Sequence, residues 1–128
     1  MKRDMNLVRE LVLFFESVEN DRPTPVKTIR IPGFSSELIV YNCEIMAEHG
    51  LILIANEMVL SSGKTFDISR LTWTGHEFAD AARDESIWNK TTARIKSTVT
   101  SMAFDSLVSV LKSSSIHVVN QGLEWLNQ

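Results

Sequence analysis

The chain has 128 residues, of which 44% are hydrophobic and 23% are charged. This length and composition are typical of one compact domain and exclude a disordered chain, a collagen and a coiled coil. Thirteen Lys and Arg against sixteen Asp and Glu give a net charge of -3, so any nucleic-acid role must rest on a local patch. A single cysteine excludes an internal disulfide framework and fits a reducing compartment.

An amphipathic helix is predicted near the N-terminus, from Asp4 to Glu19. Its apolar residues recur at helical spacing and form one stripe, made of Leu7, Val8, Leu11, Phe14, Phe15 and Val18. Pro23 and Pro25 follow, and proline ends a helix because it lacks an amide hydrogen. The β-branched alternation of Val26–Ile31 then predicts a short strand.

A second helix is predicted from Ser36 to His49, with a serine cap at its start and Gly50 after its end. The next stretch, Leu51–Leu60, is apolar and partly β-branched. A Ser-Ser-Gly-Lys turn separates it from an alternating segment, Phe66–Leu71. These two segments therefore predict a β-hairpin.

Helical patterns fill the rest of the chain. Thr74 and Glu77 have the spacing of a capping box, which predicts a third helix with a break near residues 84–86. Its apolar positions are Phe78, Ala81, Ala82, Ile87, Trp88 and Ile95. A further apolar pattern runs from Val99 to Leu111, and a last short helix is expected over Ile116–Leu126.

This order of elements predicts an α+β fold: a winged-helix-like domain of helix, short strand, helix, β-hairpin wing and helix, with a C-terminal helical extension. We expect the domain over residues 1–98, including its long helix after the wing. The extension, residues 99–128, would pack on this domain or on a second subunit, giving a homodimer through the C-terminal helices. Trp125 is the expected interface residue, because tryptophan is enriched at binding hot spots. Trp73 and Trp88 are expected in the core.

Two blocks of sequence carry a family resemblance. They are Met1–Arg9 and Arg70–Phe78, the latter followed by Ala82-Arg83-Asp84 and Trp88. With Tyr41 and His49–Ile52 between them, they resemble an uncharacterised domain-of-unknown-function family of small bacterial and prophage proteins, over about residues 1–111. The resemblance implies a winged-helix-like architecture and frequent carriage by mobile elements. It implies no reaction, ligand or catalytic residue.

The helix before the hairpin is the element that enters the major groove in DNA-binding winged helices. Here it contains no Lys or Arg, and Glu37, Glu44 and Glu48 form one stripe beside Tyr41. An exposed acidic stripe repels a phosphate backbone. The basic residues that could contact phosphate lie elsewhere and are Lys2, Arg3, Lys27, Arg30 and Lys64.

Two functions therefore stay open. One is a non-catalytic DNA-binding module resembling a transcription regulator, of phage or mobile-element type. The other is a protein-interaction factor, such as a phage-encoded inhibitor of a host defence or nucleic-acid enzyme, that uses the acidic helix face. The partner is thus DNA or a host protein.

No catalytic residue, metal site or cofactor is expected. Cys43 has apolar neighbours at helical spacing and reads as a buried hydrophobe. Glu77, Asp80 and Asp84 share a helix face that is expected to be solvated and ion-paired. Nucleotide-binding and acyl-transfer glycine motifs are absent, and no apolar stretch approaches the ~20 residues of a membrane helix. A cytoplasmic, non-enzymatic, membrane-free protein is the expectation.

Overall fold

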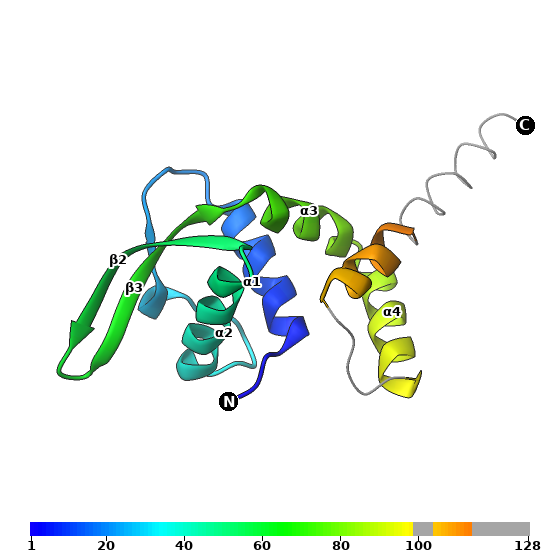
Figure 1. The fold of residues 1–128 in the computed structure, drawn as a ribbon, viewed down its shortest axis with the longest axis horizontal. Helices are drawn as coiled ribbons and strands as arrows, with labels where there is room; N and C mark the ends of the chain where they lie inside the picture. Colours follow the sequence, from blue (N-terminus) through cyan, green and yellow to red (C-terminus); the bar gives the residue numbers. More distant parts are fainter. Residues whose placement is uncertain (99–103, 114–128) are drawn as a thin grey trace, which may run out of the picture. The chain divides into compact units, whose positions relative to one another are not determined.

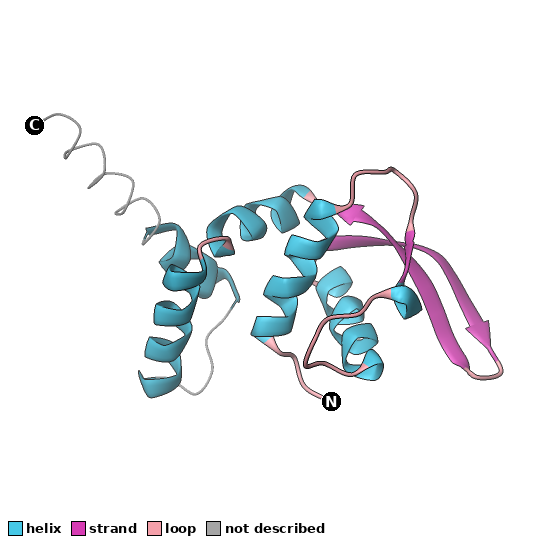
Figure 2. Ribbon diagram, turned by 180° about the vertical axis from the view of Figure 1, so that it is seen from behind, coloured by secondary structure: helices cyan, strands magenta, loops and turns pink. Residues whose placement is uncertain are grey.

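The computed structural model describes residues 1–98 and 104–113. Contacts within the chain divide it into two compact units, Met1–Ala79 and Asp80–Gln128. The first unit holds two complete α-helices, the first part of a third and a three-stranded antiparallel sheet, so it is α+β as the sequence predicts. Figures 1 and 2 show its sheet and helices from opposite sides.

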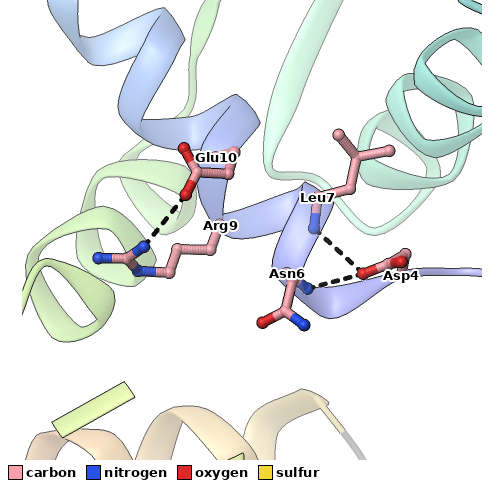
Figure 3. A network of polar contacts seen from close by, with 5 residues as sticks. All are labelled: Asp4, Asn6, Leu7, Arg9 and Glu10. Carbon is pink, nitrogen blue, oxygen red and sulfur yellow. Dashed lines mark hydrogen bonds and ion pairs between the residues drawn. The ribbon is translucent and has the colours of Figure 1, made fainter. Parts of the chain in front are cut away.

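Helix α1 spans Met5–Ser17. Figure 3 shows its start, where the Asp4 carboxylate accepts from the backbone N–H of Asn6 at 3.0 Å and of Leu7 at 3.2 Å. This cap satisfies two amides that have no partner within the helix. The buried stripe consists of Leu7, Val8, Leu11, Val12 and Phe15. It packs against α2 and β3, which confirms the predicted amphipathic helix.

The segment after α1 differs from the prediction, and the strand expected over Val26–Ile31 is wrong. The strand β1 is Thr24–Pro25, which pairs antiparallel with β3. Val26–Thr28 instead forms a 3₁₀ turn, η1. Val26 and Ile29 are both buried, and their spacing of three matches the three residues per turn of a 3₁₀ helix. The apolar residues thus reach the core without an extended backbone.

Helix α2 spans Ser36–Glu48 and is confirmed, with the Ser35 hydroxyl accepting from the N–H of Leu38 at 3.2 Å. Its buried face consists of Ile39, Asn42, Cys43 and Met46. Asn42 is the polar member of this face. Its side-chain oxygen accepts from the N–H of Asp4 at 3.0 Å, and its amide nitrogen donates to the Leu38 carbonyl at 2.9 Å and the Lys2 carbonyl at 3.4 Å. One buried amide therefore fastens the N-terminal segment to α2.

The predicted hairpin is confirmed as β2, Ile52–Leu60, and β3, Gly63–Leu71. The sheet order is β1-β3-β2, so β2 is an edge strand. Near the helices, Phe66 and Ile68 of β3 are buried in the core. The far end of the hairpin projects past α1 and α2 (Figures 1 and 2).

Helix α3 spans Trp73–Ala82 and starts two residues earlier than the capping box suggests. The cap is Thr72, whose hydroxyl accepts from the N–H of Gly75 at 3.0 Å and donates to the carbonyl of Gly50. Thr74 is the second residue of the helix, so its predicted capping role is wrong. Gly75 lies so close to the Leu51 carbonyl that a Cβ would stand 2.1 Å from the oxygen. The absence of a side chain there lets α3 begin against the hairpin.

In the second unit, α4 spans Glu85–Thr98, and residues 104–113 are also helical. The Asp84 carboxylate caps α4 by accepting from the N–H of Ile87 at 2.9 Å, which confirms the predicted break. Trp88 is 2% exposed and belongs to the core, as expected. The buried residues of 104–113 are Phe104, Leu107 and Leu111. The expected last helix and Trp125 lie outside the described residues.

Candidate functional site

The acidic face of α2 borders a groove of about 780 Å³, called the α2 groove below. Its helix side is formed by Glu37, Val40, Tyr41 and Glu44. These residues lie on the face of α2 opposite the buried residues Ile39, Asn42, Cys43 and Met46. Glu37 is exposed, whereas Tyr41 and Glu44 are half-buried. The helix therefore offers carboxylates around an amphipathic aromatic ring.

The opposite side of the α2 groove is basic. Lys27 and Arg30 come from η1 and the segment after it, and Lys64 comes from the start of β3, close to Ser62 of the turn. These cations are far from α2 in the sequence. The fold thus brings the predicted acidic stripe and three of the predicted phosphate contacts to one surface.

Two of the three cations already have protein partners. Arg30 Nη1 donates to the Lys27 carbonyl at 2.7 Å and to the Ile29 carbonyl at 3.0 Å. The Lys64 ammonium forms an ion pair with Glu57 on the neighbouring strand. The hydrogen bond from Lys64 to Glu57 and the charge of Glu57 raise the pKa of Lys64 above its ordinary value. The carboxylates of Glu44 and Glu48 add smaller contributions. Glu44 on the acidic side of the α2 groove therefore interacts electrostatically with Lys64.

Not all predicted binding residues line the α2 groove. Glu48 is exposed at the end of α2 and does not line the groove, but its charge contributes to the raised pKa of Lys64. Lys2 and Arg3 are exposed in the N-terminal segment, and of that segment Met1 is the residue that lines the groove.

The residues considered for catalysis are buried or paired with neighbouring side chains. Cys43 is fully buried, and burial, followed by the charge of Glu44, raises the pKa of its thiol from 9.0 to about 12. A thiol held neutral in this way is a poor nucleophile. Asp80 pairs with Arg83 at 2.8 Å, and Glu77 accepts from the Trp73 side chain at 2.6 Å.

Among the described side chains, no group of three or more His, Cys, Asp or Glu is placed to hold a metal ion. Likewise, none of the described helices has the length and apolarity needed to cross a bilayer.

The expectation that Trp73 packs in the core is wrong, because 80% of it is exposed. It is the first residue of α3, where Leu71 and Phe78 on either side take the buried positions. Its indole N–H donates to the Glu77 carboxylate one turn further along. Glu77 thus holds an exposed ring in place.

Sequence reasoning missed an exposed apolar triplet at the end of β2. Met58 is 53% exposed, Val59 82% and Leu60 41%. The available signal was three consecutive apolar residues next to a Ser-Ser-Gly turn, where at least one face of a hairpin is solvated.

A family model described as "Hypothetical protein (DUF2513)" matches residues 2–102. A protein of Haemophilus influenzae described as "Uncharacterized protein" is 31% identical over 124 residues, which cover 96% of this chain and 99% of that protein. No solved structure matches. The chain belongs to the DUF2513 family.

Proposed function

We propose that this member of the DUF2513 family is a non-catalytic, winged-helix-type binding module that docks a partner protein on the α2 groove. The winged-helix assignment is supported by the order α1, β1, α2, β2, β3 and by the sheet order β1-β3-β2, in which the short first strand pairs with the returning strand of the hairpin. The turn η1 occupies the place where a helix-turn-helix has its middle helix.

The observation that carries the proposal is the chemistry of α2. The helix that would read a DNA groove presents Glu37 and Glu44 to the α2 groove and has no cation of its own. Carboxylates there oppose a phosphate backbone and favour a basic partner segment. Tyr41 and Val40 between them supply the apolar contact that interface cores use. The partner class that fits is a protein that places a basic segment against α2, such as an enzyme that itself binds nucleic acid.

The first experiment is a pull-down from host lysate, with and without nuclease, using the wild-type chain and the double variant Glu37→Lys/Glu44→Lys. We expect a stoichiometric protein that survives nuclease and is lost with the double variant. The matched control is Glu19→Lys/Asp21→Lys, which makes the same charge change at exposed residues outside the α2 groove. A partner that stays bound to Glu37→Lys/Glu44→Lys would contradict docking on this face.

Duplex DNA is the second candidate, favoured by the gathering of Lys27, Arg30 and Lys64 at the α2 groove. On this hypothesis Glu37→Lys/Glu44→Lys strengthens duplex binding, because two repulsive charges become attractive. Lys27→Glu/Arg30→Glu weakens it and reduces the slope of log affinity against log salt by roughly one per lost phosphate contact. A gel-shift titration at low salt that detects no affinity for any duplex would eliminate this candidate.

A further inference from the structure

The hairpin tip carries three adjacent apolar side chains that are exposed to solvent. Met58, Val59 and Leu60 are 53%, 82% and 41% exposed. Val59 lies on one face of the hairpin beside Lys64, its partner in register, while Met58 and Leu60 lie on the other face. Consecutive exposed apolar residues are unusual on a folded surface and mark an interaction site when they cluster.

These residues lie on an edge strand with a free side. In the sheet order β1-β3-β2, no strand pairs with the outer side of β2 among the residues that the structure describes. Register shifts interrupt β2 between Leu53 and Ile54 and between Ala55 and Met58, after which pairing is regular to the turn. An unprotected edge of this kind is a template for pairing with another strand.

The free side of the tip has its hydrogen-bonding groups at Val59. The turn has two residues, so Leu60 and Gly63 are the closing pair of the hairpin. Backbone groups of successive residues in an antiparallel strand point alternately to its two sides. The N–H and C=O of Val59 therefore point away from β3, toward the open edge.

We propose that a second copy of this chain docks on this edge, with the two β2 strands antiparallel and Val59 facing Val59 across a twofold axis. In this register Met58 of each copy faces Leu60 of the other, so all three apolar residues meet apolar partners. Glu57, the one charged residue of 57–62, faces the uncharged Ser61 of the other copy. The pattern is thus self-complementary, as an isologous interface requires, and joins two three-stranded sheets into one.

This inference does not rest on the proposed function, because it uses the outer edge of β2 rather than the α2 groove. The contact is short, so the dimer should depend on concentration. It also differs from the dimer through C-terminal helices that the sequence suggests.

Sedimentation velocity of the full chain over a range of concentrations tests the proposal. We expect a monomer–dimer equilibrium that Val59→Lys weakens about tenfold or more, because two ammonium groups would face each other on the axis. The matched control is Val110→Lys, an exposed valine in the helical stretch 104–113. A monomer at every concentration, or a dimer weakened by Val110→Lys but not by Val59→Lys, would overturn the proposal.

A crosslinking experiment tests the register. Under mild oxidation Val59→Cys should form a disulfide between copies, because residues facing each other on the axis are about 5.5 Å apart at Cα, within disulfide range. Glu57→Cys should not crosslink to itself but should crosslink to Ser61→Cys in a mixture of the two variants. The native Cys43 is buried and will not compete. Val59→Cys that crosslinks no faster than Val110→Cys would refute this pairing.

Discussion

The interior of the first unit and the tip of its hairpin place the same residue types in opposite environments. Leu11 and Val12 of α1 are fully buried, whereas Leu60 and Val59 of β2 are 41% and 82% exposed. Burial of apolar area stabilises a fold, at roughly 25 cal/mol per Å² removed from water. Apolar residues of the interior therefore account for folding, and those of the tip contribute little to it, which leaves them available for binding.

The largest expected difference between the two regions is in the free energy of unfolding. Leu11→Ala leaves a cavity in the core and should lower it by about 2–5 kcal/mol. Leu60→Ala removes a side chain that is partly solvated already and should lower it by less than about 1 kcal/mol. Urea titration of both variants measures the contrast. Equal losses would mean that the tip belongs to the core, and the comparison would fail.

Polar residues show the same contrast between the interior and the hairpin. Asn42 is fully buried and its side chain joins α2 to Asp4 and Lys2. Asn42→Ala should therefore lower the free energy of unfolding by about 1–3 kcal/mol and speed hydrogen exchange at the Asp4 amide. Asn56 is exposed on β2, with φ of 52° and a 2.9 Å hydrogen bond to Asp67. Asn56→Gly keeps the backbone conformation and should cost less than about 1 kcal/mol. The opposite ranking of the two variants in urea titration would be inconsistent with these roles.

Cys43 gives the interior a pH dependence. Its pKa is raised from 9.0 to about 12, so above pH 9 the unfolded chain releases the thiol proton while the folded chain keeps it. Stability from this group therefore falls as pH rises between about 9 and 12, by about 1.4 kcal/mol per unit. The check is the difference in unfolding free energy between wild type and Cys43→Ala, measured from pH 8.5 to 10.5. A difference that does not change with pH would show that the thiol titrates normally.

The local parts of the fold could be predicted from the sequence. Helical spacing located α1 and α2, and a serine–glycine turn between β-branched segments located the hairpin. The segment Val26–Ile31 failed because β-branched residues favour a strand, while the burial of Val26 and Ile29 follows the period of a 3₁₀ turn. Tertiary packing overrode local propensity there.

The candidate site was predictable on one side only. The stripe of Glu37 and Glu44 follows from helical geometry within one element. The approach of Arg30 and Lys64 to this stripe depends on how the segment after η1 and the hairpin turn pack around α2, which no local pattern encodes. The exposure of Trp73 also depends on tertiary packing, because a tryptophan at a helix start can face the core or the solvent.

The smallest expected effect distinguishes two adjacent threonines where the hairpin meets α3. Thr72 both caps α3 through the N–H of Gly75 and donates to the Gly50 carbonyl, so Thr72→Ala should lower the free energy of unfolding by about 1 kcal/mol. Thr74 is exposed, and Thr74→Ala should change it by less than about 0.5 kcal/mol. Thr72→Ser keeps the hydroxyl and should retain most of the stability. If Thr74→Ala were the more damaging change, the helix would start at the capping box that the sequence suggests, and the hydroxyl of Thr72 would not join the hairpin to α3.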